Sequence, residues 1–341
     1  MSLPLVSAVV VNWNGGAMLQ DALASLFAQS WPALEVVLVD NASTDGSADA
    51  ATARFGSRLM VVRNTRNEGF ARGNNVGMAA AKGDWLFLLN SDAVCDPNTI
   101  EELLRFVADK PEVGQLASRV LQADRPHYFD SAGLLLYPDG VCRPRGWEEK
   151  DLGQYDRAEE VIAPHGCACA LRKTMLDQVG GFDEDFFCYL EDMDLGVRGQ
   201  LAGWKCWYVP STRVLHRKSA TAGNYSAFKA FHVERNRIYC LWKWMPRFLL
   251  FLSPLFTLNR YAMQGYAAYT HQGGSSVIMK EYSTLRLMML LLRARVAAWS
   301  RWPRMWSKRR HIQRTRRISV REWYDLVSRF KLDAIELALK R

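Results

Sequence analysis

Short, continuously apolar runs along the first two thirds of the chain alternate with stretches whose apolar residues recur at helical spacing. The runs that predict strands are Val6–Val11, Val36–Val39, Leu59–Val62, Trp85–Leu89, Cys167–Leu171 and Cys206–Val214. The stretches that predict helices are Leu19–Phe27, Ser47–Phe55, Arg72–Ala81, Pro97–Ala108, Thr174–Val179 and Asp192–Leu201. This alternation predicts an α/β fold: a Rossmann-like, mostly parallel sheet with helices on both faces.

Two further segments interrupt the alternation. Tyr137–Val141 predicts a hairpin, because Asp139-Gly140 supplies turn chemistry between apolar flanks. Residues 143–160 are polar and charged, which predicts an exposed or mobile loop. We expect the α/β body to span residues 1–225, followed by an α-helical C-terminal extension over residues 226–341.

The extension differs from the body in charge. Residues 1–228 hold 21 Lys and Arg against 29 Asp and Glu, whereas residues 229–341 hold 23 against 6. The stretch 301–321 alone carries nine basic residues and no acidic one. No run of 18 apolar residues predicts a spanning helix. The longest apolar stretch, Phe248–Leu258, is interrupted by Ser253-Pro254 and suits an interfacial position.

Three partners for the basic extension remain open: an anionic membrane surface, nucleic acid, or solvent alone. We favour the membrane, because nucleic-acid binding gives no reason for the apolar stretch. The predicted location is therefore cytoplasmic, peripheral on the inner face of the cytoplasmic membrane.

Composition narrows the class of protein. The chain has 341 residues, of which 49% are hydrophobic, and this excludes a disordered or fibrous protein. Seven cysteines occur without a Cys-x-x-Cys pair, which favours reduced thiols over a zinc site or disulfide framework. The apolar first dozen residues lack a basic leader and predict a strand rather than a signal peptide.

Polar clusters follow three of the predicted strands, where the ligand site of an open parallel sheet lies. They are Asn12-Trp13-Asn14, the stretch Asp40–Ser47 and Asn90-Ser91-Asp92. Asp40 suits a hydrogen bond from a pyrimidine N3–H, with an Asx turn as its structural alternative. Asp92 suits a divalent cation on a diphosphate, with a helix cap before Pro97 as its alternative.

Two other stretches carry candidate chemistry. In residues 67–75, glycines permit close approach of the backbone to a ligand, although the phosphate-binding Gly-Lys-Ser/Thr ending is missing. Residues 180–194 are acidic and aromatic, and Asp192 suits a general base toward a hydroxyl. Glu191 and Asp194 also suit first-turn helix charges. His216 follows a predicted strand, and its position alone does not distinguish a functional from a structural histidine.

Taken together, these motifs resemble the family 2 inverting glycosyltransferases of the GT-A fold, in particular the rhamnosyltransferase-like branch. The resemblance covers roughly residues 5–220. It rests on six motifs in order: Val-Asn-Trp-Asn at 11–14, Asp-Asn-x-Ser-x-Asp-Gly-Ser at 40–47, Asn-x-Gly-Phe-Ala at 67–71, Asn-Ser-Asp at 90–92, Gly-Phe-Asp-Glu at 181–184 and Glu-Asp-x-Asp at 191–194.

The resemblance implies a role for each matching residue. Asp192 is the catalytic base, Asp92 and His216 hold a divalent metal (Mg²⁺ or Mn²⁺), and Gly166 and Glu191 lie near the acceptor. The implied donor-binding residues are Val11, Asn12, Trp13, Asp40, Asn67, Gly69, Asn90 and Ser91. One departure is that the usual Asp-x-Asp signature reads Asn90-Ser91-Asp92, so a single carboxylate of the pair remains.

The predicted function is inverting transfer of a sugar, with L-rhamnose from dTDP-L-rhamnose as the first choice. The acceptor is a hydroxyl of a lipid-linked or cell-surface polysaccharide. A UDP-sugar donor is the alternative within the class. Outside it stand a non-catalytic nucleotide-sugar-binding protein and a nucleic-acid-binding protein that uses the basic extension.

Overall fold

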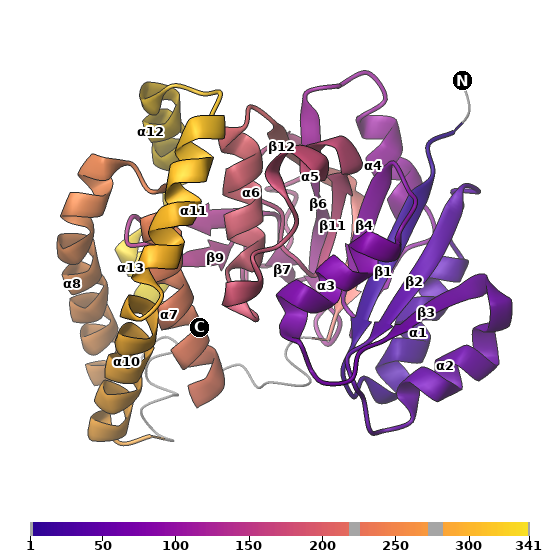
Figure 1. Cartoon of the computed structure of the whole chain (residues 1–341), viewed down its shortest axis with the longest axis horizontal. Helices are drawn as coiled ribbons and strands as arrows, with labels where there is room; N and C mark the ends of the chain where they lie inside the picture. The colour runs from indigo at the N-terminus through magenta and orange to yellow at the C-terminus, as the bar shows by residue number, and fades with distance from the viewer. Residues whose placement is uncertain (1–2, 218–225, 272–281, 340–341) are drawn as a thin grey trace. The chain divides into compact units, whose positions relative to one another are not determined.

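The computed structural model describes residues 3–217, 226–271 and 282–339 (Figure 1). Contacts between Cα atoms divide the chain into two compact units. The first consists of Met1–Gly133 with Pro144–Thr221, and the second of Leu134–Arg143 with Ala222–Arg341. We predicted a single boundary at residue 225. The prediction did not include the hairpin segment 134–143 in the C-terminal unit.

The first unit is built on a ten-stranded mixed sheet (Figure 1). Its main path runs β10-β12-β6-β11-β4-β1-β2-β3, while β5 pairs with β12 and β7 with β6. The strands are β1 Val6–Asn12, β2 Leu34–Asp40, β3 Leu59–Arg63, β4 Trp85–Leu89, β5 Ala93–Cys95, β6 Val113–Gln122, β7 Phe129–Ser131, β10 Glu159–Glu160, β11 Ala168–Arg172 and β12 Lys205–His216. The four strands β4-β1-β2-β3 are mutually parallel, as the β-α-β pattern predicts.

Helices cover both faces of this sheet. They are α1 Gly16–Phe27, α2 Ser47–Phe55, α3 Gly69–Ala80, α4 Thr99–Phe106, α5 Lys173–Val179 and α6 Glu191–Leu201. Val6, Ala8 and Val10 of β1 pack in one buried cluster with α1 and α4. Val9 packs in the other cluster, with α3 and α5. Because successive strand residues point to opposite faces, this separation confirms the predicted layered α/β architecture.

Two features of the first unit differ from the expectation. Strand β11 runs antiparallel to both of its neighbours, β4 and β6, in the middle of the sheet. Most residues of 152–159 are exposed, as predicted, but ion pairs of Arg119 with Asp151 and Asp156, and of Arg145 with Glu159, hold the segment in place. The loop prediction counted charged residues but had no means of identifying their partners.

The second unit is helical apart from one hairpin. It contains α7 Ala227–Trp244, α8 Arg247–Tyr269, α10 Thr284–Trp299, α11 Trp302–Thr315, α12 Val320–Arg329 and α13 Ala334–Leu339, with β8 Leu134–Leu136 and β9 Cys142–Pro144. The hairpin is confirmed: β8 pairs with β9, and Tyr137 N–H donates to the Val141 carbonyl across 2.7 Å.

Helix α8 continues through Pro254, so the interruption predicted at Ser253-Pro254 is wrong. Proline lacks the N–H that would bond to the carbonyl four residues earlier, on Leu250. The Ser253 hydroxyl donates to that carbonyl across 2.8 Å and satisfies it locally. The helix therefore keeps its course despite the missing backbone bond.

A buried ion-pair cluster ties the hairpin to the helices of the second unit. Arg260 on α8 donates to Asp139 of the hairpin across 2.6 Å and to Glu234 on α7 across 3.2 Å. Arg237 on α7 also binds Glu234, at 2.7 and 2.5 Å. All four side chains are buried, so each charge depends on its partners for stability.

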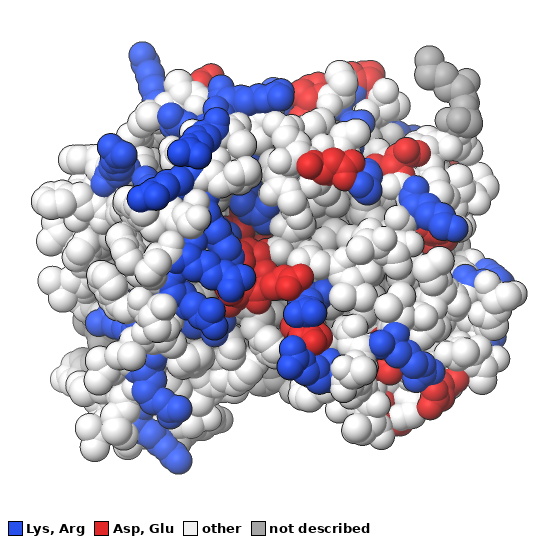
Figure 2. All heavy atoms as spheres, viewed as in Figure 1, with Lys and Arg blue, Asp and Glu red and all other residues white. Residues whose placement is uncertain are grey.

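Large apolar side chains remain exposed on two helices of this unit. Each of the following is at least half exposed: Phe248, Phe251, Leu255, Leu258, Tyr266 and Tyr269 on α8, and Leu285, Met288, Met289, Leu292, Val296 and Trp299 on α10. Figure 2 shows Lys and Arg side chains gathered over α11 in the same unit. Over the described ranges, no helix has the length and apolar character needed to cross a bilayer.

Candidate active site

The ends of β1 and β2 are joined by the side chain of Asn12. Its amide donates to the hydroxyls of Ser43 and Ser47, each across 2.9 Å, and its oxygen accepts from Gly15 N–H at 3.1 Å. Asn12 is fully buried. The amide of this predicted donor-binding residue thus shapes the two loops that follow the strands, while the neighbouring Trp13 is 43% exposed.

Asp40, the last residue of β2, is buried and adopts the Asx-turn alternative. Its Oδ1 accepts the N–H of Ser43 across 3.1 Å, and its Oδ2 lies 3.5 Å from Arg63. Asp45 forms an Asx turn of its own, accepting from the N–H of Ser47 at 3.0 Å. A turn at Asp40 does not remove the second oxygen from use, so its contact with a nucleoside stays a prediction.

Asn41 connects the loop after β2 with the start of α3, a role that sequence reasoning missed. Its amide donates to Asn67 Oδ1 and to the Gly69 carbonyl, both at 3.1 Å. Its oxygen accepts from Asn64 at 2.9 Å and from Glu68 N–H at 3.2 Å. The predicted donor-binding residues Asn67 and Gly69 are therefore anchored directly to the end of β2.

Gly69 must be glycine for two independent reasons. Its φ is +79°, and a Cβ atom there would lie 2.6 Å from both the carbonyl oxygen and a ring carbon of Phe187. Phe187 in turn accepts the N–H of Ala71 at 3.0 Å. The loop before α3 is thus packed against the segment that leads to α6.

Asp92 and His216, the predicted metal ligands, are brought together by the fold. His216 ends β12, which pairs with β5 so that His216 faces Ala93. Its Nε2 lies 3.3 Å from Asp92 Oδ1, and its Nδ1 lies 2.7 Å from Asp130 Oδ2. The three side chains form an Asp92–His216–Asp130 row that is largely buried.

The charges of this row stabilise one another. Burial alone would lower the pKa of His216, but Cys167, Asp130 and Asp92 raise it well above its ordinary value. Burial alone would raise the pKa of Asp92, but the hydrogen bond from His216 and its charge lower it. Asp92 is therefore an ionised carboxylate at neutral pH, as a cation ligand must be, whereas His216 with its raised pKa would have to release a proton before its Nε2 could bind a cation.

The residues present fit a divalent cation. A carboxylate oxygen and an imidazole nitrogen converge, and a second carboxylate fixes the other ring nitrogen, which is the usual support for a metal-binding histidine. Within the described part of the chain, no third acidic, His or Cys side chain joins them to form a three-residue metal group. Two protein ligands suit a cation such as Mg²⁺ whose remaining positions are filled by substrate phosphates and water.

Asp192, the predicted base, lies in the first turn of α6 with its carboxylate oriented by two backbone donors. Gly166 N–H donates to Oδ2 at 3.0 Å, and Met193 N–H donates to Oδ1 at 2.8 Å. A Cβ on Gly166 would lie 3.3 Å from the Phe70 ring and 3.5 Å from the Asp192 Cβ, so the backbone approaches closely. Gly166 and Asp192 are neighbours, as the resemblance implied.

Glu191 precedes the base and is fully enclosed. Its Oε2 has no hydrogen-bond partner within the described residues. Burial, and then the charge of Asp192, raise the pKa of Glu191 well above its ordinary value. Glu191 therefore holds its proton more tightly than an ordinary glutamate does.

The other acidic residue of this turn is structural, because Asp194 accepts from Arg198 across 2.9 Å in the protein interior. Arg198 also donates to the carbonyls of Val179, Gly180 and Gly181, which anchors the Gly-Gly turn against α6. Sequence reasoning missed Arg198, although its spacing of four residues from Asp194 is a recognisable helix ion-pair signal.

The backbone leading to the base is unusually constrained. Phe187, Tyr189 and Leu190 have φ values of +64°, +69° and +68°, a region that residues other than glycine rarely adopt. Such strain is retained where surrounding contacts determine the conformation, and it concentrates at functional sites. The contacts here include Gly69 and Ala71 against Phe187.

Residues 165–167 connect Asp192, the predicted base, with the Asp92–His216–Asp130 row. The His165 ring lies 6.3 Å from that of His216, Gly166 binds Asp192, and the Cys167 carbonyl accepts the N–H of Asn90 at 2.9 Å. The predicted acid–base and metal residues therefore share one edge of the sheet. Val11 packs beside Gly73 of α3.

Comparisons with known proteins concern the family of the chain. The family model described as glycosyl transferase family 2 matches residues 7–180. An N-acetylglucosaminyl-diphospho-decaprenol L-rhamnosyltransferase of Mycobacterium tuberculosis is 32% identical over 248 residues, covering 64% of this chain and 78% of that protein. The O-antigen biosynthesis protein RfbC of Myxococcus xanthus is 28% identical, covering 64% of this chain and 18% of that protein.

Two solved structures share the fold at low sequence identity. One is GalNAc-T7 with UDP, GalNAc and Mn²⁺, with a TM-score of 0.59 and 17% identity over 79% of this chain and 51% of that chain. The other is the mannosyltransferase PcManGT from Pyrobaculum calidifontis with GDP-Man and Mn²⁺. Its TM-score is 0.55, with 19% identity over 90% of this chain and 89% of that chain.

Proposed function

The chain belongs to glycosyl transferase family 2, and from this premise we propose that it transfers L-rhamnose from dTDP-L-rhamnose, with inversion, to a hydroxyl of a lipid-linked or cell-surface polysaccharide acceptor. The glycosyltransferase class follows from the family. The choice of rhamnose and of a lipid-linked acceptor rests on the 32% identical relative, whose name specifies both.

The observation that carries the reaction is the pairing of an oriented carboxylate with a nearby cation-binding pair. Gly166 and Met193 hold the oxygens of Asp192, while Asp92 and His216 lie on the same sheet edge, linked through residues 165–167. Displacement at a sugar carbon requires a base for the attacking hydroxyl and a positive charge that stabilises the leaving diphosphate, and both lie on this edge of the sheet.

In the proposed step, Asp192 accepts the proton of the acceptor hydroxyl as that oxygen attacks the anomeric carbon. The bond from the anomeric carbon to the diphosphate oxygen breaks, and its electron pair leaves with the nucleoside diphosphate. Attack from the face opposite the leaving group inverts the configuration in one displacement. Glu191, whose pKa is raised by burial and then by the charge of Asp192, is assigned a position near the acceptor.

We assign Asp92 and His216 as the protein ligands of Mg²⁺ or Mn²⁺. A bound divalent cation neutralises the negative charge that grows on the departing diphosphate. Asp130 orients His216 through Nδ1, so that Nε2 is directed toward Asp92. The single carboxylate of Asn90-Ser91-Asp92 is thus supplemented by a histidine.

Donor recognition is assigned to the loops after β1, β2 and β4 and to the start of α3. The proposed residues are Val11, Asn12, Trp13, Asp40, Asn67, Gly69, Asn90 and Ser91. The Asn41 bonds that fix Asn67 and Gly69 support this assignment, since a preformed loop costs less ordering on binding. A UDP-sugar is the alternative donor, because both uracil and thymine present the same N3–H to Asp40.

The helical unit is proposed to hold the enzyme on the inner face of the cytoplasmic membrane. Its exposed apolar residues on α8 and α10, together with the basic residues over α11, suit an anionic membrane surface. This arrangement keeps a lipid-linked acceptor within reach of the enzyme. Nucleic acid does not account for the exposed apolar side chains.

The experiment that tests the donor is a thermal-shift panel of nucleotide sugars with and without Mg²⁺ or Mn²⁺. We expect dTDP-L-rhamnose with metal to raise the melting temperature most. In a separate transfer assay, we expect the rhamnose of this donor to be transferred to a polyprenyl-diphosphate-linked sugar. Asp92→Asn should raise the divalent-metal concentration needed for half-maximal transfer. A larger stabilisation by UDP-sugars, with transfer, would replace the rhamnose assignment.

A further inference from the structure

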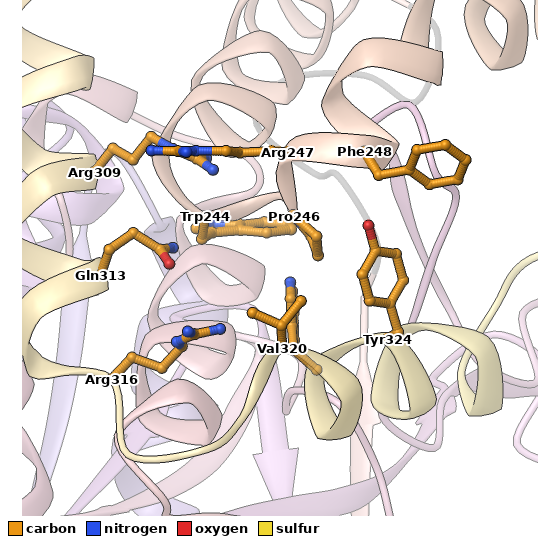
Figure 3. Close-up of a pocket in the computed structure, with 10 residues that line it drawn as sticks. Trp244, Pro246, Arg247, Phe248, Arg309, Gln313, Arg316, Val320 and Tyr324 are labelled. Atoms are coloured by element: carbon orange, nitrogen blue, oxygen red, sulfur yellow. The ribbon is translucent and has the colours of Figure 1, made fainter.

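A cavity of about 340 Å³ lies in the helical unit, and none of the residues that line it is assigned to the transfer reaction. It is enclosed by the end of α7, the start of α8, α11 with the residue after it, and α12 (Figure 3). Nothing in the proposed chemistry uses it. Its lining carries positive charge and an unpaired hydrogen-bond donor.

Every charged side chain that lines the cavity is an arginine. In Figure 3, Arg309 and Arg316 extend from α11 and its end toward the same space, and Arg247 lies beside Arg309. No Asp or Glu lines it. Burial, and then the charge of Arg247, lower the pKa of Arg309.

A buried hydrogen-bond donor also lines this cavity without a protein partner. Trp323 is 1% exposed, and its Nε1–H has no hydrogen-bond partner within the described residues. An indole nitrogen can only donate, and an unpaired buried donor is costly. Trp323 packs edge-on against Trp244, with ring centroids 5.9 Å apart, so the indole is fixed in place. An acceptor bound in the cavity against this indole would supply the missing partner.

The start of α8 adds a third source of positive potential. This 23-residue helix begins at Arg247, and no side chain caps its N-terminus. The first backbone N–H groups of a helix lack partners within it and attract anions. Arg247 and Phe248 both line the cavity. Phe248 also begins the exposed apolar stripe of α8, which continues through Phe251, Leu255 and Leu258.

We propose that this cavity binds the phosphate of an anionic phospholipid, with the acyl chains lying along the exposed apolar stripe of α8. Arg247, Arg316 and the Trp323 N–H supply donors to the phosphate oxygens, together with the remaining donors of Arg309, whose Nη1 already donates to the carbonyls of Trp242 and Met245. Free phosphate shares that chemistry but leaves the adjoining apolar stripe without a partner. The inference rests on the proposed membrane contact of the helical unit and adds to it a defined headgroup site.

The test is flotation of the full chain with phosphatidylcholine vesicles that contain or lack phosphatidylglycerol. The double variant Arg247→Gln/Arg316→Gln removes two cations from the cavity. The matched control, Arg314→Gln/Arg317→Gln, removes two exposed cations that do not line it. We expect the cavity variant to lose on the order of tenfold more affinity for phosphatidylglycerol vesicles than the control. Trp323→Phe, which keeps the ring but removes the N–H, should weaken binding without changing the total charge.

Equal losses in the two double variants would overturn the proposal, since bulk charge would then explain the binding. An unchanged affinity of Trp323→Phe, with native circular dichroism, would also overturn it. Complete displacement of vesicles by millimolar inorganic phosphate would assign the site to free phosphate instead. Transfer by the wild-type chain to a water-soluble acceptor is measured separately. Intact transfer without vesicle binding defeats only this inference, and vesicle binding without transfer defeats only the proposed reaction.

Discussion

Gly166 donates its backbone N–H to Oδ2 of Asp192 across 3.0 Å. The bond joins the loop before β11 to the first turn of α6, and it orients the carboxylate without using a side chain. A larger residue at position 166 would press on the Phe70 ring. The orientation of the proposed base therefore depends on a glycine 26 residues away in the chain.

Replacing Asp192 with Asn should reduce transfer by about 10²–10⁴-fold, because an amide does not accept the proton of the acceptor hydroxyl. Nucleotide-sugar binding should persist, as measured by thermal shift. Asp177→Asn, at an exposed aspartate paired with Lys173, is the control and should leave both quantities unchanged. Near-normal turnover by Asp192→Asn would show that another group is the base.

Replacing Asp130 with Asn should weaken divalent-metal binding by about 10–100-fold, because the His216 ring loses the carboxylate that orients it. The measurement is a metal titration of transfer, together with calorimetric binding of Mn²⁺ in the presence of nucleoside diphosphate. The exposed Asp124, changed to Asn, serves as the control. If the metal requirement of Asp130→Asn matched that of the control, the row would not be a metal site.

Acid should destabilise the helical unit through Glu234. Burial alone would raise the pKa of Glu234, but Arg237, Arg260 and Tyr261 outweigh it and lower the pKa to about 2. A depressed carboxyl pKa contributes stability above its unfolded value near 4.5 and loses that stability as the pH falls toward 2. The contribution at neutral pH is about 3 kcal/mol.

The measurement is denaturant unfolding at pH 7 and pH 3. Glu234→Gln should lower the free energy of unfolding at pH 7 by about 3–5 kcal/mol, because Arg237 and Arg260 lose their shared carboxylate. It should also flatten the dependence on pH. Asp325→Asn, at an exposed residue of α12, is the control. An acid transition of the same size in Glu234→Gln would remove Glu234 as its source.

Gly69→Ala should destabilise the protein by about 1–3 kcal/mol, since alanine at a positive φ is strained and its Cβ would meet the Phe187 carbonyl. Gly265→Ala is the opposing control: it lies within α8 with nothing inside 4 Å of its Cβ position, and should stabilise the helix by about 0.5–1 kcal/mol. Denaturant unfolding measures both. Equal stability of the two variants would mean that the α3 loop tolerates a side chain.

Local patterns were sufficient to predict the layered sheet and most helices. The apolar run Val6–Val11 and the helical spacing from Leu19 to Phe27 each reflect burial of one short segment. The antiparallel course of β11 was not predictable in this way. It is set by pairing with β4 and β6, which lie far away in sequence.

In the candidate site too, residues within local motifs were predictable and residues that depend on long-range contacts were not. Asp92, Asp192 and His216 could be predicted because motifs carry them. Asp130 could not, since it meets His216 across 86 residues and no motif includes it. A signal was present nonetheless: Asp130 follows an aromatic residue in the short strand β7, and a buried charge requires a partner.

The hairpin 134–143 has a consequence for biosynthesis. Asp139 is translated 98 residues before Arg237 and 121 residues before Arg260, the two cations that neutralise it in the folded protein. At about 5–20 residues per second, the ribosome needs on the order of ten seconds to supply them. The C-terminal helices therefore complete their core with a segment synthesised earlier, and expression of residues 226–341 alone would leave Arg237 and Arg260 without their Asp139 carboxylate.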